Sequence, residues 1–250
     1  MSTSPHPVEL SNRIIDSGVA EPPHNRVINE LTEIDDDVAV VESFSHCWVI
    51  RTDEGLVCFD ASGVPSGPVV VEAIRGWSDD PIHSIVYTHG HLDHVGGSGA
   101  FIADAGSRGT ARPRFLAHEA LLPRFDRYRT TSDWNILINR RQFGGIIRRQ
   151  DLGIGGTGPV FLPDDVAEPD ETFGDTMSLE VGGHTIELRH ARGETDDHVW
   201  GWDASRKSAF TGDFMAWVFP NAGNPQKVQR YPIEWAAALR DMLAAGAENV

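Results

Sequence analysis

The sequence contains few cysteines, only Cys47 and Cys58 in 250 residues. Two thiols cannot build the disulfide framework that stabilises many small secreted domains. Both cysteines lie in segments that we expect to be neighbouring strands. We therefore predict two buried free thiols, with a single disulfide between them as the alternative.

Long apolar runs are also absent. No stretch approaches the ~18 apolar residues that a transmembrane helix needs, so we expect no membrane partner. Residues 1–10 lack the basic region and the apolar core of a signal peptide. These two absences predict a cytoplasmic protein.

Basic side chains are scarce, with 21 Lys and Arg against 37 Asp and Glu and a formal net charge of −16. A nucleic-acid-binding surface needs clustered Lys and Arg, so we expect no nucleic-acid partner. A small anionic substrate remains compatible with this charge, because a bound metal supplies a local positive field. Seven arginines nevertheless gather in residues 124–150. This segment is either a solvated helix face with salt bridges or a lid over an active site.

Three histidines and one aspartate occur within six residues, directly after the apolar run of residues 82–87. That run predicts a short buried strand. His89 and His91 are two residues apart, so in an extended segment they point the same way and can bind one ion. Asp93 and His94 follow where the chain must turn, so they face another direction and can bind a second ion.

This His-x-His-x-Asp-His pattern resembles the signature of the metallo-β-lactamase superfamily and matches it at every position. The resemblance implies an α/β (α+β) fold, the αββα sandwich, with two mixed sheets and outer helices. The predicted elements agree, because a hairpin run over residues 38–59 precedes alternating strands and helices. We expect residues 1–25 to form a loose N-terminal arm and residues 26–250 to form the domain.

The remaining metal ligands are expected later in the chain. The superfamily carries Gly-Asp at Gly212 and Asp213, which implies that Asp213 bridges two ions with its two oxygens. Glu194 stands where many members carry a histidine, and a carboxylate can replace an imidazole on Zn²⁺. His190 and His198 are the alternatives to Glu194 as ligand.

A glutamate at this place is a feature of the alkyl sulfatase branch of the superfamily. Other segments resemble that branch as well, namely residues 117–119, the Arg- and Asn-rich segment, and residues 219–221 with 229–230. The resemblance implies that Asn221 and Arg230 hold an anionic group of the substrate. Tyr128 and Asn139, from the Arg- and Asn-rich segment, are further candidate substrate contacts.

Two smaller expectations concern the edges of the site. Asp60 ends a predicted strand, where it is either a hydrogen-bonding partner of the ligand loop or a helix cap. The superfamily supplies one more histidine after a last strand, and we expect this chain to be truncated before that strand. A homo-oligomer is a further expectation, with Trp134, Trp217 and Trp235 at its contacts.

Together these features predict a dinuclear metal-dependent hydrolase that uses a metal-bound hydroxide, with Asp93 as ligand and proton acceptor. We expect two divalent ions, Zn²⁺ first, although iron and manganese also suit such ligands. The expected substrate is a small anionic sulfate ester. The alternatives are a thioester, lactone or β-lactam hydrolase on the same scaffold, and a non-catalytic metal-binding protein.

Overall fold

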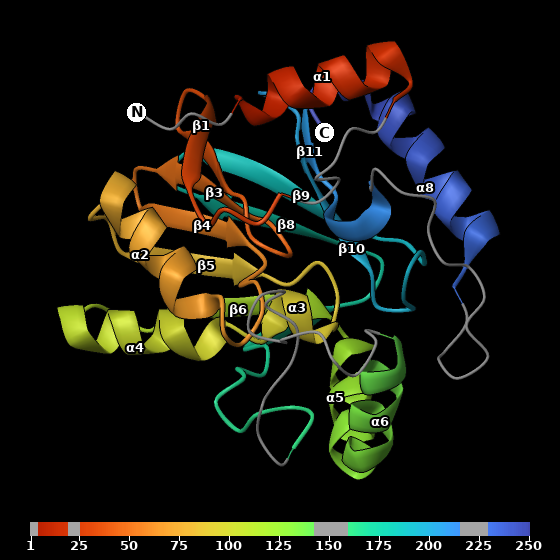
Figure 1. The fold of residues 1–250 in the computed structure, drawn as a ribbon. Coiled ribbons are helices and arrows are strands. Elements are labelled where there is room, and N and C mark those ends of the chain that lie inside the picture. Colours follow the sequence, from red (N-terminus) through yellow and green to blue (C-terminus); the bar gives the residue numbers. More distant parts are fainter. Residues whose placement is uncertain (1–4, 20–25, 143–159, 216–229) are drawn as a thin grey trace.

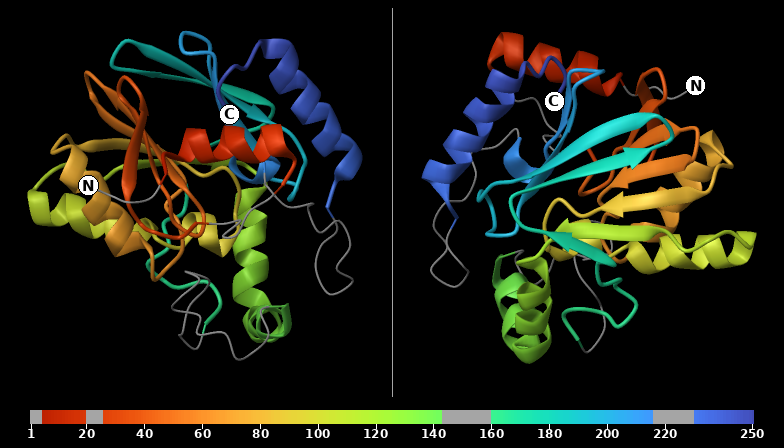
Figure 2. Two further views of the ribbon diagram at one scale, coloured as in Figure 1. Left: turned by 45° about the horizontal axis from the view of Figure 1, so that its top comes forward. Right: turned by 180° about the vertical axis from the view of Figure 1, so that it is seen from behind.

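The computed structural model describes residues 5–19, 26–142, 160–215 and 230–250 (Figure 1). Two β-sheets face each other, and helices cover their outer sides (Figures 1 and 2). This arrangement is the αββα sandwich that the sequence predicts. None of the described helices is long and apolar enough to cross a lipid bilayer.

The larger sheet has seven strands in the order β1-β2-β3-β4-β5-β6-β7. Their bounds are β1 Leu31–Asp35, β2 Val38–Val41, β3 Cys47–Thr52, β4 Gly55–Phe59, β5 Ile82–Val86, β6 Arg114–His118 and β7 Glu171–Phe173. The strands from β1 to β4 pair antiparallel, and those from β4 to β7 pair parallel. The larger sheet is therefore mixed, as predicted.

Both faces of this sheet are buried, which explains why β4 carries no polar side chain. Along β3 and β4, Cys47, Val49 and Cys58 point to the core beneath the helices. Ile50 and Val57 point the other way, to the core between the two sheets. The alternation follows from the two-residue repeat of a strand, which turns successive side chains to opposite faces.

The smaller sheet has four strands in the order β11-β10-β9-β8. Their bounds are β8 Thr176–Val181, β9 His184–His190, β10 Val199–Asp203 and β11 Ser208–Phe210. All of these strands pair antiparallel, so the expectation of a second mixed sheet was wrong for the described strands. The reason is local, because short connections join consecutive strands and can only reverse the chain. Between β8 and β9, Gly182 and Gly183 make the turn with φ of 49° and 81°.

Helices close both outer faces of the sandwich (Figure 2). The helices described after the N-terminal segment are α2 Gly67–Trp77, α3 Leu92–Val95, α4 Ser98–Arg108, α5 Leu121–Thr130, α6 Ser132–Gln142, η1 Gly212–Phe214 and α8 Pro232–Ala245. On the smaller sheet, Trp235 of α8 packs in a cluster with Trp200 and Trp202. Trp235 is therefore buried and is not the subunit contact that we expected. Trp134 is 51% exposed, and Trp217 lies outside the described residues.

The N-terminal segment is more ordered than the predicted loose arm, because Pro7–Ser17 form helix α1. Proline at the first turn and Gly18 in the left-handed conformation after the last turn favour these two ends. The His6 ring bonds the Glu33 carbonyl at 3.0 Å, and Arg26 donates to the Pro5 carbonyl at 2.7 Å. These contacts attach the segment to the domain.

The two cysteines are free and buried, which confirms the prediction of two thiols. They lie on the adjacent strands β3 and β4. The Cys47 thiol donates to the Asp60 carbonyl at 3.2 Å.

The Arg- and Asn-rich segment is helical where it is described, in α5 and α6. Its remainder and the glycine-rich residues 153–158 lie outside the described residues. Helix α5 begins at Leu121, because β6 continues through His118 to pair with Phe173. The parallel strands β4, β5 and β6 all end at one edge of the sheet, and α3 lies at that edge (Figure 1). Ligand sites of open parallel sheets lie at such an edge.

Candidate metal centre

The ligand loop leaves the carboxyl end of β5, a central strand of the larger sheet. His89 and His91 lie on the extended stretch that follows the strand. His91 directly precedes α3, and that single turn of helix carries Asp93 and His94. The change from extended chain to helix sends the two pairs of side chains in different directions, as the sequence predicts. A buried strand thus gives the loop a rigid origin.

Asp60, at the end of β4, holds this loop in place. Its two carboxylate oxygens accept hydrogen bonds from the amide and the hydroxyl of Thr88, both at 2.7 Å. The same carboxylate lies 2.7 Å from Nδ1 of His94. Burial raises the pKa of Asp60, and the His94 contact opposes that rise. Since a carboxylate accepts, Nδ1 of His94 carries the proton and Nε2 is left for a metal.

The first donor group consists of His89, His91, Glu194 and Asp213, and one ligand atom from each lies within 4.8 Å of the others. Nε2 of His89 is 3.0 Å from Nδ1 of His91 and 3.6 Å from Oε2 of Glu194. Oε2 of Glu194 is 3.8 Å from Nδ1 of His91. Donor atoms at this spacing surround one cation-sized position.

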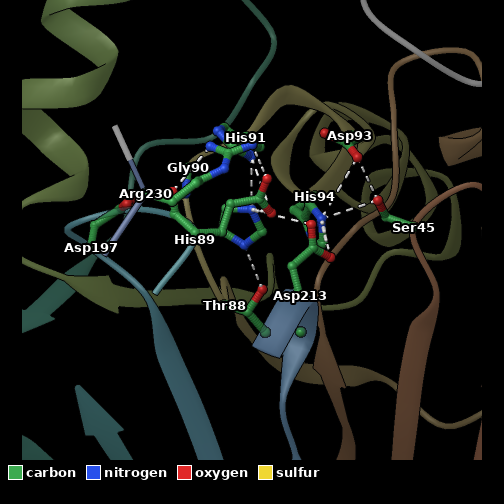
Figure 3. A network of polar contacts seen from close by, with 12 residues as sticks. Ser45, Thr88, His89, Gly90, His91, Asp93, His94, Asp197, Asp213 and Arg230 are labelled. Atoms are coloured by element: carbon green, nitrogen blue, oxygen red, sulfur yellow. Dashed lines mark hydrogen bonds and ion pairs between the residues drawn. The ribbon is translucent and has the colours of Figure 1, made fainter. Parts of the chain in front are cut away.

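The second donor group consists of Asp93, His94 and the other oxygen of Asp213. Nε2 of His94 lies 3.2 Å from Oδ1 of Asp213 and 3.7 Å from Oδ2 of Asp93. Oδ2 of Asp213 instead faces His89, 3.9 Å from its Nε2. Figure 3 shows Asp213 between His89 and His94. Its two oxygens therefore face two different donor groups, as a carboxylate that bridges two ions would.

The charges of the two groups suit divalent cations. Burial lowers the pKa of His89 and His91, so both imidazoles are neutral and present lone pairs. Burial and the neighbouring Asp213 raise the pKa of Glu194, because two carboxylates at short range repel each other. Burial would lower the pKa of His94, but Asp213 and Asp60 raise it well above its usual range. A cation between these carboxylates would relieve the repulsion, so the residues present fit a metal site.

The three alternatives for the ligand near residue 194 are now distinguishable. Glu194 contributes its oxygen to the first donor group. Nε2 of His190 bonds the Asp196 carbonyl at 2.9 Å, and its ring stacks on His118. His198 is fully buried, and its ring stacks on Phe214 with 3.9 Å between centroids. The geometry therefore favours Glu194.

Arg230 lies at the site, but its guanidinium pairs with Glu194 and does not face an open substrate position. Its guanidinium forms an ion pair with Oε1 of Glu194, and Nη1 donates to the Glu194 carbonyl at 3.1 Å. This contact turns Oε2, the other oxygen, toward the histidines. Asn221, the expected partner of Arg230 in anion binding, lies outside the described residues.

Tyr128 and Asn139 are the other two candidate substrate contacts, and the side chains of both contact residues of the protein itself. Tyr128 is 5% exposed, and its ring packs in the core against Phe161 with centroids 4.9 Å apart. The Asn139 side chain donates to the Asn135 carbonyl at 2.8 Å, one turn earlier in α6. The structure therefore gives no support to either as a substrate contact, because local helix and core contacts already satisfy them.

A buried ion pair behind the ligand loop was not identified from the sequence. Arg124 of α5 is 4% exposed and donates from Nε to Oδ1 of Asp197 at 3.0 Å. Oδ2 of Asp197 accepts from the amide of Gly90, between the first two histidines, at 2.8 Å (Figure 3). Arg124 also pairs with Asp196. One of the seven arginines thus has a specific buried role, whereas Arg129 pairs with Asp126 and Glu168 at the surface.

His118 offers a test of pH dependence outside the donor groups. Its Nδ1 accepts from the Ala120 amide at 3.1 Å, and burial, followed by His190, lowers its pKa. The unfolded chain therefore takes up a proton first, and this residue makes the free energy of unfolding fall as pH drops below about 6.5. In His118→Asn, the side-chain oxygen can still accept from Ala120 but does not titrate. We expect the variant to lose less stability between about pH 7.5 and about pH 5.

Urea unfolding of the metal-free protein at both pH values measures this difference. An equal loss of stability in the variant and the unchanged protein would show that His118 does not titrate as described.

Known proteins are similar to this chain in sequence and in fold. The family model described as the metallo-beta-lactamase superfamily matches residues 40–217. A linear primary-alkylsulfatase from Pseudomonas sp. (strain ATCC 19151) is 26% identical over 212 residues, covering 80% of this chain and 39% of that protein. The chain thus spans less than half the length of this relative.

Solved structures share the fold at low sequence identity. The stereoselective inverting sec-alkylsulfatase Pisa1 from Pseudomonas sp. has a TM-score of 0.66 and 20% identity, with 87% of this chain and 36% of that chain covered. A metallo-beta-lactamase from Pontibacter korlensis has a TM-score of 0.58 and 19% identity, with 88% and 87% covered. At these identities the likeness concerns the fold alone.

Proposed function

The chain belongs to the metallo-beta-lactamase superfamily, and from this premise we propose that it is a dinuclear metal-dependent hydrolase. His89, His91 and Glu194 would hold one divalent ion, and Asp93 and His94 the other, with Asp213 between them. Two such ions, Zn²⁺ first, would act as Lewis acids and lower the pKa of water at neutral pH. The two oxygens of Asp213, each facing a different donor group, are the observation that carries this proposal.

The side chains around the ligands have separate tasks in this scheme. Asp60 fixes the ring of His94 through Nδ1 and so directs Nε2 into the site. Arg230 takes one oxygen of Glu194 and leaves the other for the metal. Asp93 is partly exposed, and a proton released by water during hydrolysis can pass to a carboxylate in this position.

We further propose a sulfate ester as the substrate. The sequence similarity to a linear primary-alkylsulfatase and the glutamate in the first donor group both favour this class. A sulfate ester is an anion, and the chain carries a net charge of −16. Binding therefore needs local positive charge, which the two ions would provide.

The proposal is tested with protein reconstituted with Zn²⁺ and offered primary and secondary alkyl sulfates, a thioester, a lactone and a β-lactam. We expect the protein to release sulfate from the alkyl sulfates. A chelator should abolish this activity, and added Zn²⁺ should restore it. Running the reaction in ¹⁸O-labelled water reports whether the S–O or the C–O bond breaks, from the label in sulfate or in alcohol.

Two results would contradict the proposal at different levels. Turnover of the thioester, lactone or β-lactam without any of the sulfates would retain the hydrolase and reject the sulfate ester. A protein that binds no divalent ion after reconstitution would reject the metal centre itself. Two bound ions without turnover of any ester would favour a metal-binding protein without catalysis.

A further inference from the structure

A serine from a neighbouring loop lies among the ligand atoms of the second donor group. Ser45 stands in the connection between β2 and β3, and it is 7% exposed. Its hydroxyl donates to Oδ2 of Asp93 at 2.8 Å and lies 3.1 Å from Nε2 of His94 (Figure 3). Both of these atoms are the ones that we assign to the second metal ion.

These atoms lie at distances close to those between the ligands of one metal ion. In a tetrahedral zinc site with metal–ligand distances of about 2.0–2.2 Å, the ligand atoms lie about 3.3–3.6 Å apart. Around Nε2 of His94 the distances are 3.1 Å to Ser45, 3.2 Å to Asp213 and 3.7 Å to Asp93. Ser45 therefore stands as close to the ligand atoms as they stand to one another.

The orientation of His94 supports the same position for the ion. Because Nδ1 faces the Asp60 carboxylate, an ion can bind only at Nε2. The atoms that face Nε2 are Oγ of Ser45 and Oδ1 of Asp213. An ion on Nε2 would therefore meet the hydroxyl oxygen as well as the carboxylate.

The loop that carries Ser45 is held by its own contacts. Oγ of Ser43 accepts from the Ser62 hydroxyl at 2.9 Å, and the Ser43 carbonyl lies 3.0 Å from Nδ1 of His46. Ser43 and Ser62 are both fully buried. The hydroxyl of Ser45 is thus presented by a rigid support rather than by a freely moving side chain.

From these observations we propose that the Ser45 hydroxyl is a ligand of the second metal ion, together with Asp93, His94 and Asp213. The proposal rests on the dinuclear site of the proposed function. It makes the two sites chemically different, because the second has one nitrogen and three oxygens whereas the first has two nitrogens. Oxygen ligands suit harder ions such as Mn²⁺, so the second site should hold Zn²⁺ less tightly than the first and accept Mn²⁺ more readily.

Three variants test the proposal. Ser45→Ala should raise the dissociation constant of the second ion at least about 10-fold, the lower end of what loss of a supporting contact alone causes, and leave the first ion unchanged. Ser45→Cys loaded with Co²⁺ should show a thiolate-to-cobalt charge-transfer band. The unchanged protein should lack that band although it contains Cys47 and Cys58, because both thiols are buried in the core and neither belongs to a donor group. Ser78→Ala is the control, because Ser78 is as buried as Ser45 but its hydroxyl donates to Asp80 after α2, away from the donor groups, and this variant should retain both ions.

Metal titration by calorimetry, elemental analysis and the cobalt spectrum give the readouts, and none of them requires turnover. Two ions bound with unchanged affinity in Ser45→Ala, or a Co²⁺-loaded Ser45→Cys protein without the thiolate band, would overturn this proposal while leaving the metal centre in place. An unchanged protein that binds no ion would overturn both this proposal and the proposed function.

Discussion

Asp213→Asn is expected to reduce the number of bound divalent ions from two to at most one and to lower hydrolysis by about 100- to 1,000-fold. That range corresponds to the several kcal/mol that metal ions contribute to a transition state. The physical reason is the position of the two oxygens, one 3.2 Å from His94 and the other 3.9 Å from His89. An amide nitrogen donates hydrogen bonds and does not bind a cation, so one of the two donor groups loses its shared ligand.

Elemental analysis and rates with the best substrate from the ester panel measure this effect. Asp203→Asn is a suitable control, because Asp203 ends β10 away from the donor groups and contacts only Ser205 and Arg206 among the hydrogen-bond partners described. We expect the control to retain both ions. An Asp213→Asn protein that still binds two ions would show that the bridge is not where we place it.

The second large effect is expected for Arg124→Met, which should lower the free energy of unfolding by about 3–5 kcal/mol. Arg124 and Asp197 are almost fully buried, and removal of the guanidinium leaves the Asp197 carboxylate in the interior without its partner. The Asp197 carboxylate also accepts from the Gly90 amide, so the ligand loop should be disturbed as well. Methionine fills a similar volume, which limits the loss of packing.

Two further variants test whether the loss of stability comes from the buried ion pair between Arg124 and Asp197. Arg129→Met, on the same helix, removes exposed ion pairs and should change the free energy of unfolding by no more than about 1 kcal/mol. The double variant Arg124→Met with Asp197→Asn should recover much of the loss, because the buried charge is gone and the amide oxygen can still accept from Gly90. Urea unfolding of the metal-free proteins measures all three. Equal stability of Arg124→Met and Arg129→Met would contradict a structural role for the buried pair.

Much of the fold follows from local sequence patterns. The stretch from β5 to α3 is apolar and then rich in His and Asp, and such a pattern requires only a strand followed by a turn. Helix α8 begins at Pro232, where proline suits the first turn of a helix, and its buried residues Trp235, Ala238 and Met242 share one face. The antiparallel smaller sheet could also have been expected, because Gly182 and Gly183 mark a tight hairpin. The superfamily pattern led us instead to two mixed sheets.

The N-terminal helix shows where local patterns were insufficient. Residues 7–17 have an ordinary apolar content, but α1 buries only Ile14 among its side chains. Two contacts attach it to the domain, His6 with Glu33 and Arg26 with Pro5, and the residues of each pair are far apart in the sequence. Contacts of this kind leave no periodic signal, so the segment was predicted to be loose.

The candidate site also has residues that the local sequence predicts and residues that it does not. His89, His91, Asp93 and His94 are close in sequence, so their chemistry and spacing alone predict two groups of metal ligands. The choice of Glu194 over His198, and the contact of Arg230 with Glu194, depend on how the loop of residues 191–198 folds back on the ligand loop. Ser45 and Asp197 stand 48 and 107 residues from their partners Asp93 and Gly90, and nothing in their local sequence marks them. Local chemistry therefore identifies the first ligands, whereas the packing of distant segments decides which side chains complete and support the two metal positions.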